Sequence, residues 1–202
     1  AFYEPTSAAA SLDTLIPVNM ATAARDAMAG VEKRRGSVDQ YVSKHLGYPV
    51  DNEGMFLADK DGKAVLDKDG QRIRPFSAEQ VDALAAAIDN VERGAAFIIG
   101  DQTGIGKGRI AAGMLRYAMK KGMVPVFLTE KPDLYGDMYR DLRDIGVPEM
   151  LGREPRMFIT NSGETITLDE EALSWKQESE EARRNGEPAP KKRGKFLVGG
   201  TA

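Results

Sequence analysis

Residues 97–109 read FIIGDQTGIGKGR, an apolar run that leads into a glycine-rich loop containing a lysine. The apolar run begins at Ala95 and is typical of a strand buried on both faces. After the loop, apolar side chains recur at helical spacing, at Ile110, Met114 and Tyr117. Glycines allow backbone N–H groups to turn inward around an anion, and the start of a helix adds a partial positive charge. The order of strand, loop and helix therefore predicts a binding site for nucleotide phosphates at Gly104–Gly108.

The loop departs from the common phosphate-binding pattern G-x-x-x-x-G-K-[ST] at two positions. Asp101 takes the place of the first glycine, and Gly108 stands where the hydroxyl that binds Mg²⁺ belongs. Thr103 or a water molecule could replace that ligand, and Lys107 supplies a mobile cation for the β- and γ-phosphates. The alternative is a glycine-rich turn with a chance lysine. A dinucleotide fingerprint is disfavoured, because a third glycine at the right offset and an acidic residue for the ribose are missing.

Two further strand candidates follow the loop, at Val124–Thr129 and Arg156–Thr160. Together with the run at 95–99 they lie about one βαβ unit apart, which predicts a parallel sheet with right-handed crossovers. Pro132 suits the first turn of an intervening helix, whose inward positions are Leu134, Met138, Leu142 and Ile145. Residues 170–196 are polar and charged, and we expect them to form a mobile linker or insertion.

The residues upstream of the loop predict helices and turns. Residues 1–18 are rich in small residues and prolines, and we expect them to wrap a surface as extended chain. Asn19 is the expected cap of a helix over residues 20–34, whose inward stripe is Ala24, Met28 and Val31. Ser37 is the expected cap of a second helix, with an inward face of Val38, Tyr41, Val42 and Leu46.

Residues 54–74 contain short apolar runs separated by Asp61-Gly62 and Asp69-Gly70, which are hairpin turn signals. The repeated Asp-Lys-Asp-Gly resembles a calcium loop, but the glycine and glutamate positions of an EF-hand do not fit, so turns are preferred. Ser77-Ala-Glu-Gln80 is a capping box at the start of another helix, which ends near Gly94. The inward positions of this helix are Val81, Leu84, Ala85, Ile88 and Val91.

The composition restricts the kinds of site and partner. Hydrophobic residues make up 42% and charged residues 29%, which allows an ordinary folded core. A net charge of −3 gives no overall basic field, so any contact with nucleic acid has to be local. Cysteine is absent and His45 is the one histidine, so no metal held by cysteine or histidine is expected. No apolar stretch reaches the roughly 20 residues that span a bilayer, and no secretory signal begins the chain. The expected location is the cytoplasm, or a virus particle filled from it.

At the glycine loop the sequence resembles the strawberry notch family of superfamily 2 helicase-like ATPases, whose bacterial and phage members are often fused to methyltransferases. The resemblance rests on residues 100–109, on Phe127–Lys131 and on Asp141–Gly146, and it covers most of residues 15–160. The family shares the Gly-Lys-Gly-Arg ending of the loop. The resemblance implies an α/β fold, a partial RecA-like P-loop parallel sheet flanked by helices. Its implied parts are a helical extension over residues 1–53, a β-hairpin over 54–76, a RecA-like half-domain over 77–165 and a linker or insertion over 166–202.

The resemblance also implies roles for particular residues. The nucleotide-binding set would be Gln80 with the loop residues Thr103, Gly104, Ile105, Gly106, Lys107, Gly108 and Arg109. Gln80 lies 27 residues before Lys107, about where a helicase-type glutamine reads adenine, although the capping box employs it equally well. The residues that end the second strand candidate, Thr129, Glu130 and Lys131, stand where helicases contact a nucleic-acid backbone, and a solvated loop is the alternative.

The leading hypothesis is therefore the ATP-binding front part of a helicase-like ATPase that acts on DNA with ATP and Mg²⁺, encoded by a phage or mobile element. The expected partners are DNA and other domains of a longer polypeptide, with no membrane. Hydrolysis needs an Asp-Glu pair on a later strand. The acidic cluster at 169–171 reads as a helix start or solvated loop, so we expect no catalysis by this fragment alone. The alternatives are a processed structural or interaction protein, such as a virion-internal or anti-restriction component that keeps a P-loop fold, and, last, a small phosphotransferase.

Overall fold

The computed structural model describes residues 1–100, 104–131, 134–146 and 169–190. The chain divides into two compact units, Ala1–Val126 and Phe127–Ala202. The division falls inside the predicted half-domain over residues 77–165, whose extent stays a prediction. Among the helices within the described ranges, none combines the length and the apolar character needed to cross a lipid bilayer.

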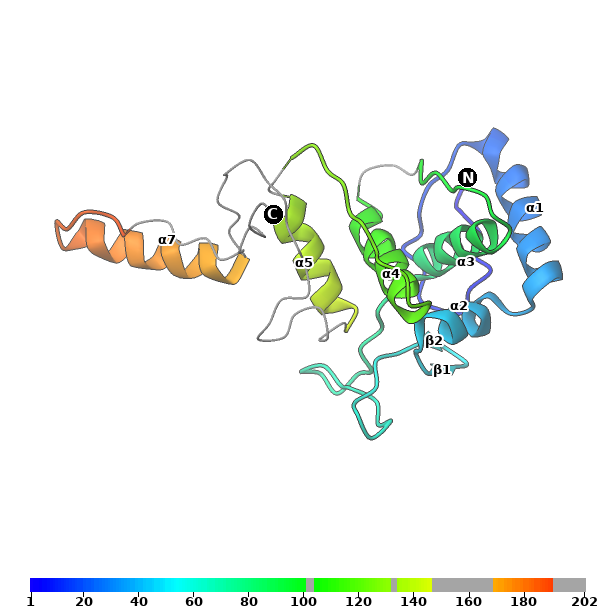
Figure 1. The fold of residues 1–202 in the computed structure, drawn as a ribbon, viewed down its shortest axis with the longest axis horizontal. Coiled ribbons are helices and arrows are strands. Elements are labelled where there is room, and N and C mark those ends of the chain that lie inside the picture. The colour runs from blue at the N-terminus through cyan, green and yellow to red at the C-terminus, as the bar shows by residue number, and fades with distance from the viewer. Residues whose placement is uncertain (101–103, 132–133, 147–168, 191–202) are drawn as a thin grey trace. The chain divides into compact units, whose positions relative to one another are not determined.

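Helices form the core of the first unit. These are α1 (Val18–Arg35), α2 (Val38–Leu46), α3 (Ala78–Glu92) and α4 (Lys107–Lys120). Helix α3 is central, because it packs against each of the other three (Figure 1). The fully buried side chains at these contacts are Val42, Leu46, Leu84, Ile88 and Ile110. Gly113 allows the close approach of α4 to α3, since a Cβ there would lie 2.8 Å from Cδ2 of Leu84.

Local capping signals fix two of the helix starts. The Ser37 hydroxyl accepts a hydrogen bond from the Gln40 N–H, and Ser77 and Gln80 form the expected capping box of α3. The predicted cap at Asn19 is wrong. Helix α1 begins two residues earlier than predicted, at Val18, because Pro17 already has φ of −56° and its carbonyl accepts the Met20 N–H.

The region between α2 and α3 is a set of short antiparallel pairings, as the turn signals predicted. Strands β1 (Val50–Asp51) and β2 (Gly54–Met55) pair first, and isolated bridges join Ala58 to Ala64 and Leu66 to Arg72. Asp61-Gly62 connects the two partners of the first bridge, and Asp69-Gly70 connects those of the second. The side chains of Asp59 and Asp67 accept N–H groups of their own turns, which confirms that these repeats are turns.

The N-terminal segment, residues 1–16, is held by carboxylates from α2 and α3. Asp82 accepts the Tyr3 hydroxyl and the N–H groups of Thr6 and Ser7, at 2.7–3.0 Å. Asp39 accepts from Ser7 and Ala8 in the same way, and Glu79 accepts from Ser11 and Leu12. These buried carboxylates satisfy backbone N–H groups that would otherwise lack partners, so they fix the path of a segment that has no regular secondary structure.

The two apolar runs within the described residues differ from expectation. Neither 95–99 nor 124–129 belongs to a strand in the described chain, and Ile98 and Val124 are 89% and 88% exposed. The prediction that these runs are buried strands is therefore wrong for the structure in hand. A parallel strand is stable only when neighbours pair with its edges and cover its faces. The third strand candidate, Arg156–Thr160, lies outside the described residues.

The second unit contains α5 (Leu134–Asp144) and α7 (Asp169–Arg184). Met138, Leu142 and Ile145 are buried, as predicted, whereas Leu134 is exposed. Helix α7 occupies part of the segment expected to be a linker, because glutamate, alanine and arginine are strong helix formers even in a highly charged sequence. Its first residue is Asp169, which confirms the interpretation of the acidic cluster as a helix start.

Candidate functional site

The predicted phosphate loop turns sharply into the start of α4. Gly104 has φ of +112°, and Gly106 has φ of +78° and ψ of 45°, a left-handed conformation that side chains with a Cβ rarely adopt. Gly106 is the N-cap of α4, where no side chain accepts a hydrogen bond from the helix. Lys107 is therefore the first residue of a helix whose N-terminus has no side-chain cap, an arrangement that suits an anion.

Gln80 connects the loop to α3. Its side chain is buried, and its Oε1 accepts the Ser77 N–H at 3.0 Å as part of the capping box. Its Nε2 donates to the carbonyl of Ile105 at 2.8 Å. A Cβ on Gly106 would lie only 2.4 Å from that nitrogen, so the loop rests directly on the glutamine. The structure thus brings Gln80 into contact with Ile105 and Gly106, which belong to the same predicted nucleotide-binding set.

The two basic residues of the loop lie in different surroundings. Lys107 and Arg109 are both half-buried at the start of α4. The guanidinium of Arg109 reaches back to the carbonyl of Pro75, at a long 3.5 Å, just before the capping box of α3. Arg109 therefore contributes to the packing of α4 on the entry to α3.

A mostly apolar hollow adjoins the loop at Ile105 and Gly100. Its walls come from the N-terminal segment, α1, α3 and the run at 97–100, and they include Tyr3, Ile16, Met28, Ala83 and Phe97. Two carboxylates, Glu79 and Asp82, also line it. Burial raises the pKa of Asp82 from 3.8 to about 6, although hydrogen bonds from Thr6, Tyr3 and Ser7 act to lower it. The N-terminal segment thus donates hydrogen bonds to both of the carboxylates that line this hollow beside the loop.

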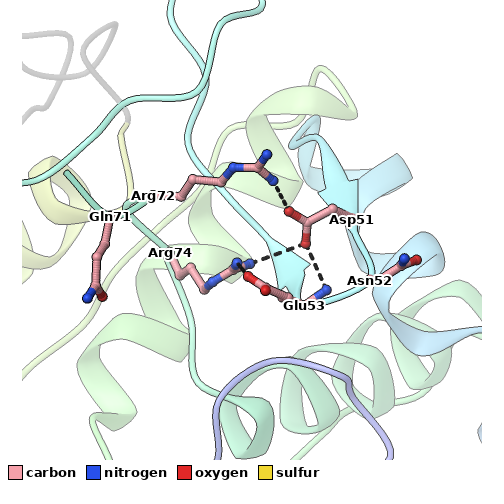
Figure 2. Close-up of a pocket in the computed structure, with 6 residues that line it drawn as sticks. All are labelled: Asp51, Asn52, Glu53, Gln71, Arg72 and Arg74. Atoms are coloured by element: carbon pink, nitrogen blue, oxygen red, sulfur yellow. Dashed lines mark hydrogen bonds and ion pairs between the residues drawn. The ribbon is translucent and has the colours of Figure 1, made fainter.

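A second hollow lies on the short antiparallel region and is separate from the loop. Figure 2 shows Arg72 and Arg74 pointing toward Asp51 and Glu53 across it. Arg72 pairs with Asp51, while Arg74 pairs with Glu53 and lies 3.4 Å from Asp51. The two positive charges are matched by two negative ones, so this hollow lacks the surplus cation that a phosphate site needs.

The remaining predicted residues are placed elsewhere or lie outside the described ranges. Thr129, Glu130 and Lys131 belong to the second unit, where the Thr129 hydroxyl accepts the Lys131 N–H in a local turn. Thr103 lies outside the described residues. Sequence reasoning missed the role of the Ile105 carbonyl. The available signal was the capping box, since it fixes Oε1 of Gln80 toward Ser77 and leaves the NH₂ group to find another acceptor.

The comparison with known families identifies the chain. A family model described as P-loop containing NTP hydrolase pore-1 matches residues 55–167. The chain belongs to this family. The matched part of this P-loop NTP hydrolase includes α3, the loop, α4 and α5, and membership indicates nucleotide binding. No curated protein and no solved structure is significantly similar to the chain.

The loop of this P-loop NTP hydrolase fits a phosphate group better than a metal ion. Gly106 places no side chain at the N-terminus of α4, and Lys107 would supply the cation to a bound phosphate. The family generally binds nucleotide together with Mg²⁺. Residues 104–109 carry no side-chain oxygen, since Gly108 replaces the usual hydroxyl residue. Within the described part of the loop, the protein therefore offers Mg²⁺ no side-chain ligand, and the metal would depend on Thr103, phosphate oxygens and water.

Proposed function

We propose that residues 104–109 bind the phosphates of ATP, and that the chain is the ATP-binding front part of a helicase-like ATPase acting on DNA. The observation that carries the proposal is the left-handed Gly106 at the N-cap of α4, followed at once by Lys107, in a chain of a P-loop NTP hydrolase family. The first N–H groups of α4 lie at this terminus, and Lys107 is the first residue of the helix. Each favours a negative ligand, and together they match a polyphosphate.

The helicase-like part of the proposal rests on the resemblance to the strawberry notch family. In that assignment Thr129, Glu130 and Lys131 contact the DNA backbone, and the parent protein is encoded by a phage or mobile element. In the sequence, the acidic cluster at 169–171 is not preceded by an apolar run that ends in Asp-Glu, so it is a poor candidate for the acidic pair of hydrolysis. We therefore assign ATP binding to this chain and place hydrolysis outside it.

The test is nucleotide binding by the full 202-residue chain, measured by isothermal titration calorimetry with Lys107→Ala and Lys120→Ala. These two lysines stand at opposite ends of α4, so the second variant controls for the loss of a charge on the same helix. Loss of a charge-assisted hydrogen bond costs about 1.5–3 kcal/mol, which is roughly a tenfold or larger rise in Kd. Equal ATP affinity in wild type and Lys107→Ala would remove the loop from the proposal.

A second assay addresses hydrolysis and DNA. We expect negligible phosphate release from ATP by this chain, with or without single-stranded DNA. Lys131→Ala should weaken DNA binding and reduce its salt dependence, because one phosphate contact is lost. Brisk turnover by the isolated chain would contradict the assignment of hydrolysis to another part of the protein, and unaltered DNA binding in the variant would exclude Lys131 from the contact.

A further inference from the structure

We infer that Gln80 is a positioning residue for the phosphate loop, an inference that rests on the proposed function. The hydrogen-bonding groups of its side chain are engaged inside the protein, by the Ser77 N–H at 3.0 Å and the Ile105 carbonyl at 2.8 Å. The assignment of oxygen and nitrogen is fixed by chemistry, because the Ser77 N–H can only donate and the Ile105 carbonyl can only accept. A glutamine that read adenine would need both amide atoms for the base.

The bond to Ile105 determines which way the next N–H group points. The peptide between Ile105 and Gly106 is trans, so its C=O and N–H groups point in opposite directions. When Gln80 holds the carbonyl on the α3 side, the Gly106 N–H is directed away from α3. The glutamine thereby orients one of the backbone donors that would face a bound phosphate.

The contact is too close to be incidental. Nε2 of Gln80 lies where a Cβ on Gly106 would be only 2.4 Å away, and Gly106 itself adopts φ of +78°. The same nitrogen lies 3.5 Å from the Gly106 carbonyl. Gln80 is only 6% exposed, so it is placed by the packing of α3 and cannot swing outward without breaking its part-buried hydrogen bond to the Ile105 carbonyl.

The experiment separates positioning from helix capping and from base reading. Gln80→Glu keeps an oxygen for the capping box but removes the donor to Ile105. Gln80→Met removes both functions without adding charge, and Ser77→Ala removes only half of the capping box. Affinities for inorganic triphosphate, ATP and GTP are measured for each variant of the full chain, with circular dichroism melts to report stability.

The positioning role predicts that Gln80→Glu and Gln80→Met raise the Kd for triphosphate about tenfold, the size expected when one buried hydrogen bond is lost. The loss should be equal for ATP, and the ratio of ATP to GTP affinity should stay constant. Ser77→Ala should lower the melting temperature but leave triphosphate affinity within twofold.

Three results would overturn the inference. Unchanged triphosphate affinity with a lost preference for ATP over GTP means that Gln80 reads the base. A loss in Gln80→Glu alone means that the added charge repels the ligand. A loss in Ser77→Ala as large as in Gln80→Met means that capping accounts for the effect. The proposed function fails separately, when wild type binds no triphosphate or Lys107→Ala binds as tightly as wild type.

Discussion

Replacing Gly106 by alanine tests the loop geometry directly. Two costs follow from the structure. A left-handed residue with a Cβ costs about 1 kcal/mol relative to glycine. The new Cβ would also lie 2.4 Å from Nε2 of Gln80, so the amide has to move and its 2.8 Å bond to Ile105 is lost, at about 1 kcal/mol more. We expect Gly106→Ala to lower the free energy of unfolding by about 2 kcal/mol.

Gly70→Ala is the matched control. Gly70 has φ of +75°, almost the same as Gly106, but no atom lies within 4 Å of the Cβ position. Its expected cost is the conformational cost alone, about 1 kcal/mol. The difference between the two variants therefore isolates the contact with Gln80, and in a chain of this size 1 kcal/mol corresponds to a melting-temperature difference of roughly 2–4 °C.

Urea unfolding followed by circular dichroism measures both variants, and calorimetry measures their affinity for triphosphate. Gly106→Ala should also bind triphosphate about tenfold more weakly, whereas Gly70→Ala should bind it as wild type does. If Gly106→Ala proves no more destabilising than Gly70→Ala and binds triphosphate normally, then the loop does not rest on Gln80 in the way the distances indicate.

Three further predictions concern the core around α3. Asp89 is fully buried, and burial acts to raise its pKa, but Arg34, Arg35 and Arg93 hold that pKa at about 2. Asp89→Asn should therefore lower the free energy of unfolding at pH 7 by about 2 kcal/mol in urea titrations. An unchanged free energy of unfolding would show that the arginines contribute nothing. Burial raises the pKa of Asp82 from 3.8 to about 6, so the folded chain binds that proton more tightly than the unfolded chain does. The resulting contribution to the free energy of unfolding, up to about 3 kcal/mol, is complete below about pH 4 and is lost as the pH rises through 6. Across this window the free energy of unfolding of Asp82→Asn should change less with pH than that of wild type. Gly113→Ala should destabilise the chain by about 1–3 kcal/mol in thermal melts, because its Cβ would lie 2.8 Å from Leu84, whereas Gly30→Ala in α1 faces only the flexible end of Arg34 and should be neutral or stabilising.

Local signals predicted the helices of the first unit well. The capping box at Ser77 and the cap at Ser37 act over three residues, so the sequence contains everything that decides them. The inward face of α2 followed from periodicity for the same reason. The error at Asn19 shows the limit of such signals, since two starts two residues apart were both possible and the backbone of Pro17 decided between them.

Contacts between distant parts of the chain could not be predicted in this way. The bond from Gln80 to Ile105 joins residues 25 positions apart, and nothing in either local pattern specifies the partner. The apolar runs at 95–99 and 124–129 show the complementary failure. Their composition is typical of buried strands, but burial depends on neighbours that a single run does not encode, and in the described structure both runs contain strongly exposed residues.

The first turn of α3 explains how distant segments converge on one loop. Glu79 accepts hydrogen bonds from the N-terminal segment, Gln80 donates to the phosphate loop, and Asp82 again holds the N-terminal segment. Successive positions of a helix point in different directions, so one turn can anchor two segments that do not need to contact each other. The phosphate loop has few side chains with which to fix its own shape. Its geometry therefore depends on a helix 25 residues upstream, whose position in turn depends on the carboxylates that hold residues 1–16.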